Sequence, residues 1–284
     1  MFESWITYTV AFIFLQVAFL QLFKLATRKS KDIGALTVCV QVFAALFALT
    51  LSPFFDWTWP TDWLVWLLLG LAWICYAGAD RLNATARKEL EISVENLIHQ
   101  VWRPFFFFTG IVFLGRTFTW LRLLGGVIIV LANMSLFFQK GKFRIGKYEI
   151  VKLIAMLCFT AAMTLDVHNS GYFNLGFYMF MSFFAPAVIL FVIGQAKPNK
   201  VWQELKEGNT LAIIFCALCN GVGAVAILMA YQFEFFLAAS ISSVTVILNV
   251  FFAYVFLKER SNLARKLIAA AVILGGLVLV IWPI

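Results

Sequence analysis

Four ionisable residues recur at every fourth position of an otherwise apolar segment: Glu91, Glu95, His99 and Arg103. This spacing places them on one face of a helix. The carboxyl group of Glu95 could bind a substrate ammonium group or carry a coupling proton, and His99 could relay protons near neutral pH. Arg103 stays charged and could bind a carboxylate or phosphate through two parallel hydrogen bonds. The structural alternative is an ion-pair ladder that only holds helices together.

Two further apolar segments carry polar groups at helical spacing. In the segment 63–86, the aromatic rings of Trp73 and Tyr76 lie beside the carboxylate of Asp80, a combination that suits an organic cation or ammonium group. In the segment 235–257, the hydroxyl group of Ser242 and the amide group of Asn249 could bind substrate or form hydrogen bonds across helices. An interfacial pair near the cytoplasmic surface is the structural alternative for the aromatic group. The candidate substrate-binding residues are therefore Glu95, His99, Arg103, Trp73, Tyr76, Asp80, Asn249 and Ser242.

The composition assigns these segments to a membrane protein. Hydrophobic residues are 63% of the chain and charged residues 13%, whereas soluble domains have about 25% charged residues. Ten segments are continuously apolar over about 20 residues, the length that a helix needs to cross the hydrocarbon. Continuous rather than alternating hydrophobicity favours helices over a barrel. The predicted spans are 5–23, 33–52, 63–86, 91–114, 119–138, 149–167, 173–194, 210–230, 235–257 and 266–282.

The distribution of basic residues predicts the orientation of these spans. Of the 22 Lys and Arg residues, 18 lie in or beside the loops that follow odd-numbered spans. The positive-inside rule places these loops in the cytoplasm and both termini outside. We therefore expect a multi-pass protein of the bacterial inner membrane or plasma membrane. The net charge of +8 then reflects topology, so we expect membrane lipid and no nucleic acid as a partner, with a specific basic binding site as the minor alternative.

The two halves of the chain end in similar sequences. Residues 112–116 are matched by 255–259 at an offset of 143, and Arg122 falls on Arg265 at the same offset. Five spans per half is an odd number, so the second half enters the membrane from the opposite side. The sequence thus predicts an all-α integral membrane protein of ten transmembrane helices, in two inverted five-helix repeats over 1–142 and 143–284.

The run Phe-Leu-Lys-Glu-Arg at 256–260, followed by a final segment rich in small residues, resembles the EamA-type branch of the drug/metabolite transporter superfamily. That family typically shows Leu-Gly-Glu-Arg after its fourth and ninth helices. The second copy matches at Leu257, Glu259 and Arg260, whereas Arg116 stands where the first copy usually has Glu. The family often has a proline midway along its fourth helix, where this chain has Pro104.

This resemblance implies ten helices in two inverted bundles, metabolite transport, and a central cavity. The cavity would be lined mainly by helices 3, 4, 8 and 9, with help from 1 and 6. The small residues Gly221 and Gly276, by contrast, are expected to allow close packing of helices rather than to bind a ligand.

The sequence therefore predicts a secondary active transporter or exporter rather than an enzyme. The mixed charge of Glu95 and Asp80 together with Arg103 favours a small polar metabolite with both charges, an amino acid or related amine, moved by alternating access. The chain has no nucleotide-binding or metalloprotease motif, so we expect a small-molecule substrate, a proton as the candidate coupling ion, and no cofactor or metal. The alternatives are efflux of drugs and organic cations, or a non-transporting lipid flippase subunit.

Overall fold

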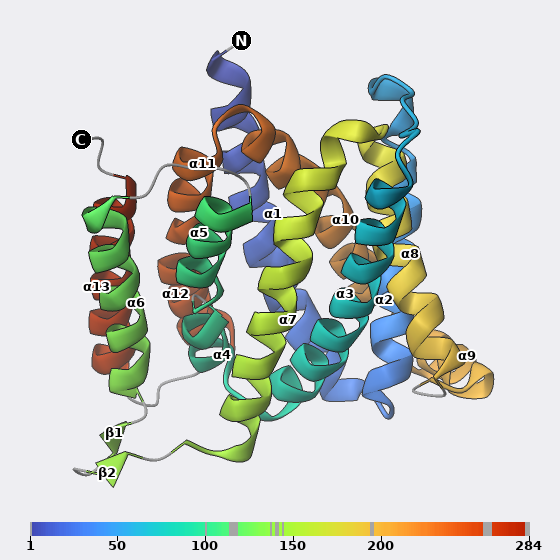
Figure 1. The fold of residues 1–284 in the computed structure, drawn as a ribbon. Coiled ribbons are helices and arrows are strands. Elements are labelled where there is room, and N and C mark those ends of the chain that lie inside the picture. The colour runs from blue at the N-terminus through green and yellow to red at the C-terminus, as the bar shows by residue number, and fades with distance from the viewer. Residues whose placement is uncertain are drawn as a thin grey trace.

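Long apolar helices run side by side along one direction of the computed structural model (Figure 1). Six of the described helices are long and apolar enough to cross a membrane, as judged by their length and composition. They are α1 (Phe2–Lys29), α2 (Ile33–Leu49), α3 (Trp63–Glu89), α7 (Lys147–Asn169), α8 (Leu175–Val192) and α10 (Thr210–Phe233). The structure describes residues 2–99, 101–113, 119–136, 138–139, 142–143, 145–193, 196–257 and 263–281.

The other four predicted spans contain six further helices. These are α4 (Ile92–His99), α5 (Trp102–Phe113), α6 (Trp120–Leu136), α11 (Phe235–Ile241), α12 (Thr245–Leu257) and α13 (Leu263–Ile281). The 3-10 turn η3 (Ser242–Val244) joins α11 to α12. Continuous helices over 91–114 and 235–257 were therefore the wrong expectation. Pro104 explains the interruption of the first, because proline has no N–H for the carbonyl four residues earlier and its ring clashes with that carbonyl.

The smaller elements lie between these helices. The 3-10 turns η1 (Ser52–Phe54) and η2 (Ser170–Tyr172) follow α2 and α7. The two-residue strands β1 (Phe138–Gln139) and β2 (Lys142–Phe143) pair antiparallel between α6 and α7. One short helix, α9 (Pro198–Glu207), lies outside the ten spans predicted from the sequence.

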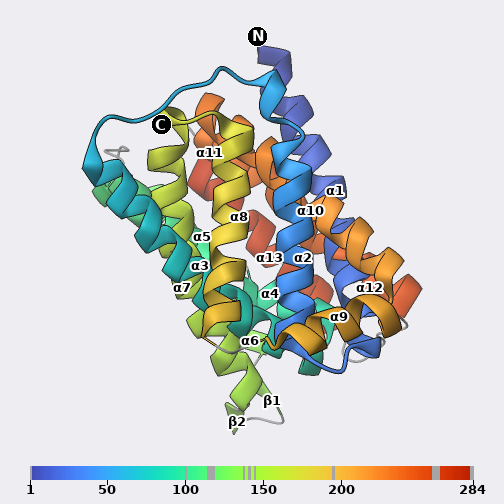
Figure 2. The ribbon, with the colours of Figure 1, turned by 90° about the vertical axis from the view of Figure 1, so that its right-hand side faces the viewer.

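Helices from the two halves of the chain pack against each other in pairs. The main pairs are α1 with α10, α3 with α7, α2 with α8, and α6 with α13, and Figure 2 shows α8 running close to α2. A Cβ atom on Gly221 of α10 would lie 2.4 Å from the carbonyl oxygen of Ala44 in α2. On Gly276 of α13 it would lie 2.8 Å from the carbonyl oxygen of Gly125 in α6. Gly221 and Gly276 therefore lie where helix backbones approach each other closely.

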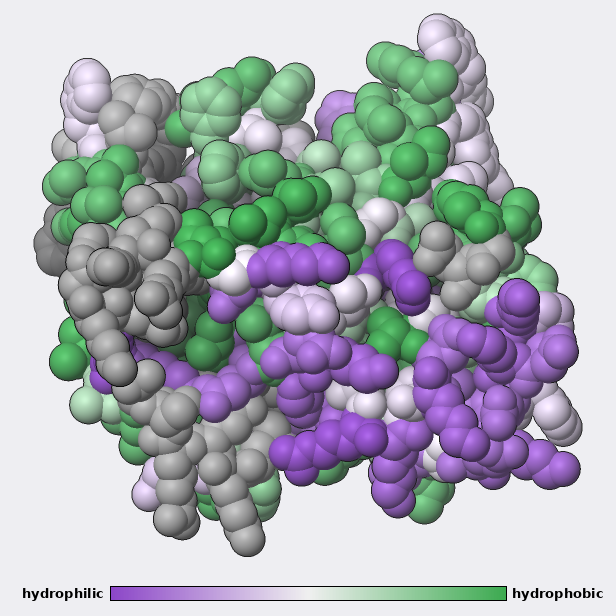
Figure 3. All heavy atoms as spheres, turned by 90° about the horizontal axis from the view of Figure 1, so that it is seen from below, coloured by the Kyte–Doolittle hydropathy of each residue, from purple (hydrophilic) through white to green (hydrophobic). Residues whose placement is uncertain are grey.

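One end of the bundle is rich in hydrophilic side chains. The start of α1 and the end of α13 lie at the opposite end (Figure 1), where Trp57, Trp59 and Trp63 are exposed. Seen from below, the hydrophilic end presents a broad face of hydrophilic side chains (Figure 3). Its exposed basic residues include Arg28, Lys29, Lys31, Lys88, Lys147, Lys197, Lys200 and Lys206. Basic residues thus gather at one end of the bundle, and the two terminal helices begin and end at the other. The orientation of the protein in a membrane stays a prediction.

Helix α9 is fixed to the hydrophilic end by a buried carboxylate. Glu204 accepts hydrogen bonds from the backbone N–H groups of Lys31 and Asp32, at 2.7 and 2.9 Å. Asp32 in turn caps α2 by accepting from the N–H of Ala35 at 3.1 Å. Burial acts to raise the pKa of Asp32, but hydrogen bonds from Lys200 and Ala35 outweigh it and lower that pKa. The loop between α1 and α2 is therefore joined directly to α9.

Candidate functional site

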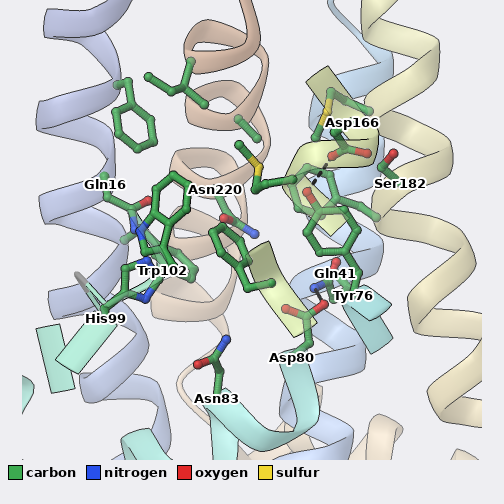
Figure 4. A pocket seen from close by; sticks show the side chains of 18 of the residues that line it. Gln16, Gln41, Tyr76, Asp80, Asn83, His99, Trp102, Asp166, Ser182 and Asn220 are labelled. Atoms are coloured by element: carbon green, nitrogen blue, oxygen red, sulfur yellow. Dashed lines mark hydrogen bonds between the residues drawn. The ribbon is translucent and has the colours of Figure 1, made fainter. Parts of the chain in front are cut away.

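A pocket of about 150 Å³ lies between helices of both halves. Helices α1 to α5 line it from the first half, and α7, α8, α10 and α12 from the second. Figure 4 shows its polar side chains around a common space, with Trp102 and His99 on one side and Asp80, Gln41 and Asp166 on the other. Further polar lining residues are Gln16, Asn83, Ser182, Asn220 and Thr245. Pockets with a few polar groups on a mainly apolar wall are the usual form of small-molecule sites.

The structure brings four of the eight predicted site residues to this pocket and leaves four outside its wall. Tyr76, Asp80, His99 and Arg103 line the pocket. Glu95, Trp73, Asn249 and Ser242 are not among its lining residues. Glu95, Asn249 and Ser242 are buried among protein groups, so their described contacts are with the protein itself.

Asp80 lies on the pocket wall with a neutral partner. Its Oδ2 accepts a hydrogen bond from Nε2 of Gln41 at 2.5 Å, which joins α3 to α2. Gln41 is 6% exposed, and its Oε1 has no hydrogen-bond partner among the described residues. A buried acceptor without a donor is costly. Asp80 and Gln41 together therefore present acceptor oxygens to a ligand donor.

Asp166 forms a second acidic site on the opposite half of the chain. Its two carboxyl oxygens accept hydrogen bonds from the hydroxyl groups of Tyr76 at 2.5 Å and Tyr178 at 2.6 Å. Tyr76 lies one helical turn before Asp80 on α3, so it connects the two acidic sites. From the sequence alone, Asp166 near the end of the predicted span 149–167 is a candidate for a gate or a loop residue, and it is not among the candidate substrate-binding residues. An ionisable group inside an apolar segment is the signal that supports including it.

Glu95 belongs to a buried cluster of charges below the pocket. Lys152 of α7 forms an ion pair with Glu95 of α4, donates to Oδ1 of Asn83 at 2.7 Å, and lies 3.2 Å from Nδ1 of His99. Nε of Arg87 lies 3.2 Å from Oε1 of Glu95. The carboxylate of Glu95 therefore has two cationic partners. The contacts favour the structural alternative for Glu95, although the partner comes from another helix.

Arg103 connects the two interrupted spans. Its guanidinium donates to the carbonyl oxygen of Ala239 and to Oγ of Ser242, the latter at 3.2 Å from both terminal nitrogens. Ser242 donates to the same carbonyl at 2.8 Å. This carbonyl belongs to the turn where α11 passes into η3, so it needs donors from outside a regular helix. Arg103 thus stabilises the interruption in the second half while it lines the pocket.

Four residues of the site and its charge cluster are not among the candidates predicted from the sequence: Lys152, Arg87, Gln41 and Asn83. Lys152 lies within the predicted span 149–167, and its burial is complete at 0% exposed. A lysine at such a position requires a partner. That requirement was a usable signal, but it did not identify Glu95 as the partner, because the two residues lie on helices from different halves.

The fold and pocket define an all-helical protein whose long apolar helices are suited to a membrane and surround a polar pocket. No known family model matches this chain, and no curated protein matches its sequence. A solved crystal structure is similar in fold, with a TM-score of 0.68 over 98% of this chain and 96% of that chain, at 14% sequence identity. At this identity the likeness shows a shared fold and carries no function.

Proposed function

We propose that this chain is a secondary active transporter, an exporter of a small polar metabolite that works by alternating access. In this proposal ten helical spans cross the membrane as two inverted repeats, as the resemblance to EamA-type transporters implies. The substrate is an amino acid or a related amine, and a proton is the candidate coupling ion. The single observation that carries the proposal is a pocket with acidic and basic sides, built by helices of both halves.

The helix boundaries support the duplication on which this proposal depends. Helices α4 and α11, α5 and α12, and α6 and α13 each begin 143 residues apart. The packing is also exchanged between halves, because α1 packs on α10 where its counterpart α7 packs on α3. Two units that alternate in conformation around a shared site are the basis of alternating access.

The charges around the pocket support a substrate of mixed charge. Asp80 and Asp166 lie on one side, and Arg87 and Arg103 also reach the wall. The ion pair of Lys152 with Glu95 lies directly beyond His99. A ligand that carries both an ammonium group and a carboxylate would match both kinds of charge in this buried site.

A specific feature of the wall also supports the alternative of organic-cation efflux. Aromatic rings from α1, α5, α7 and α8 line the pocket: Phe12, Phe19, Phe23, Trp102, Phe159 and Phe183. Rings beside carboxylates attract lipophilic cations. Growth of cells with and without the protein, in the presence of a panel of cationic drugs, would distinguish this activity from metabolite export.

Uptake into proteoliposomes tests the proposed function. We expect purified protein to accumulate at least one amino acid or amine, and the uptake to change when a proton gradient is imposed. Asp80→Asn should abolish uptake, whereas Asp56→Asn, the same change on an exposed loop, should leave it intact. No transport of any amino acid or amine, with or without the gradient, would refute the proposal.

A further inference from the structure

The cationic groups near the pocket already have partners within the protein. Arg87 and Lys152 share the carboxylate of Glu95. Arg103 donates to the carbonyl of Ala239 and to Ser242. Arg87 also lies over the rings of two phenylalanines of α1, with its Cζ 5.2 and 5.1 Å from their centroids. These contacts hold the basic side of the pocket in place before a ligand arrives.

The two aspartates differ from these cations in the kind of partner they have. Gln41 is the donor to Asp80, and Tyr76 and Tyr178 are the donors to Asp166. Among the residues that the structure describes, neither aspartate forms an ion pair. A carboxylate offers about four acceptor positions, so each retains acceptor capacity. Two acidic groups on one wall therefore lack a cation, and each could receive one from a ligand.

Two buried polar atoms in the wall indicate opposite requirements. Oε1 of Gln41, beside Asp80, is an acceptor without a donor, whereas Nε1 of Trp102 is a donor without an acceptor among the described residues. Gln41 and Trp102 are 6% and 5% exposed. They lie on opposite sides of the pocket in Figure 4. A ligand that satisfies both would donate at Gln41 and accept at Trp102.

His99 adds a second donor on the Trp102 side. Its Nδ1 lies 3.2 Å from the ammonium group of Lys152. An ammonium group only donates, so Nδ1 accepts and the proton of the neutral ring is on Nε2. The ring of His99 also lies 6.3 Å from that of Trp102. His99 and Trp102 thus place N–H donors on the same side of the pocket (Figure 4), and such donors suit the oxygens of a carboxylate.

We propose that the substrate is a basic diamino acid, with two amino groups and one carboxylate. This inference rests on the proposed transport function and makes its substrate class specific. The α-amino group binds Asp80 and the Oε1 of Gln41, and the carboxylate accepts from Trp102 and His99. The second amino group binds Asp166, with the ring of Tyr76 beside it. Each charged group of such a ligand therefore finds its own partner in the wall.

Three ligands with closely matched aliphatic chains test this assignment on the native protein in proteoliposomes. They are 2,5-diaminopentanoate, 2-aminopentanoate, which lacks the second amino group, and 1,4-diaminobutane, which lacks the carboxylate. Each missing charged hydrogen bond lowers the affinity by a factor of about ten or more. We therefore expect the diamino acid to inhibit uptake of a labelled substrate at least about tenfold better than either of the two analogues. Equal competition by 2-aminopentanoate or by 1,4-diaminobutane would overturn the inference and leave transport itself standing.

Substitution of Asp166 tests whether this residue binds the second amino group of the ligand. Asp166→Asn keeps an acceptor for a tyrosine and removes the charge, so it should weaken the diamino acid about tenfold and leave 2-aminopentanoate unchanged. Asp56→Asn is the matched control and should change neither. Retention of the full diamino acid preference in Asp166→Asn would refute the role of Asp166. If that variant is not folded, the three-ligand comparison on the native protein still decides the substrate class. Absence of uptake of all three would count against the proposed function instead.

Discussion

The two interrupted spans of this protein, α4–α5 and α11–α12, share a backbone plan but differ in their chemistry. Both spans begin, and both resume after the interruption, at positions 143 residues apart. The first span carries Glu95, His99 and Arg103, and at the same offset the second carries Ala238, Ser242 and Val246. The positions at which the helices bend have thus been retained in both halves, whereas the ionisable groups occur in one.

The interruptions also have different causes. In the first span Pro104 removes a backbone donor and imposes the bend locally. The second span has no proline, and the buried carbonyl of Ala239 accepts hydrogen bonds from Ser242 and from Arg103 of the first span. The first interruption is therefore local, while the second depends on a side chain from the other half. The two interruptions are therefore joined into a single unit by Arg103.

The largest expected effect concerns the matched pair Lys152 and Thr9, which lie 143 residues apart in α7 and α1 and are both 0% exposed. Lys152→Met leaves Glu95 buried without its nearest cation, so it should lower the free energy of unfolding by about 3–5 kcal/mol. Thr9→Val loses one hydrogen bond to the carbonyl of Trp5 and should cost about 1 kcal/mol. Thermal unfolding of the purified protein in detergent measures both.

The double variant Glu95→Gln with Lys152→Met separates lost charge balance from lost packing. It removes both charges, so most of the loss caused by Lys152→Met should be recovered. If Lys152→Met and Thr9→Val lower the melting temperature equally, the ion pair contributes nothing particular. The contrast between the two halves would then be one of sequence alone.

A smaller effect is expected at the matched glycines Gly221 and Gly78, in α10 and α3. A Cβ on Gly221 would lie 2.4 Å from the carbonyl oxygen of Ala44, whereas Gly78 has no such neighbour within 4 Å. Gly221→Ala should therefore destabilise the protein by about 1–3 kcal/mol, because backbone must move. Gly78→Ala should stabilise it by up to about 1 kcal/mol through helix propensity. Melting temperatures that move in the same direction would contradict the close approach of α2 and α10.

Local sequence features predicted the parts of the fold that depend on composition. Apolar segment length placed the six long helices, and the repeat in 112–116 and 255–259 indicated equivalent positions in the two halves. The role of Gly221 followed from the need for small residues where lipid gives no hydrophobic driving force. These features act within one helix or one contact, so the sequence expresses them directly.

The partners of the polar groups could not be predicted in the same way. The stripe of Glu95, His99 and Arg103 indicated one helix face, but Lys152 and Ala239, which bind two of its members, lie on helices of the other half. Only the tertiary arrangement brings them together. Pro104 was a usable signal, because a proline in a helical segment predicts an interruption. The prediction of one continuous helix over 91–114 did not take it into account.

The smallest expected effect tests whether the two interruptions act as one unit. Arg103→Lys keeps the charge but loses the planar fork that reaches Ser242 and Ala239. Ser242→Ala removes one acceptor and one donor, at a cost of about 1 kcal/mol. In a double-mutant cycle these two changes should show a coupling energy of about 0.5–1 kcal/mol, whereas Arg103→Lys with the distant Thr9→Val should be additive. Chemical or thermal unfolding of the four variants gives the coupling. A value of zero would mean that α11 and α12 bend without help from Arg103, and the two halves would then have retained the same interruption independently.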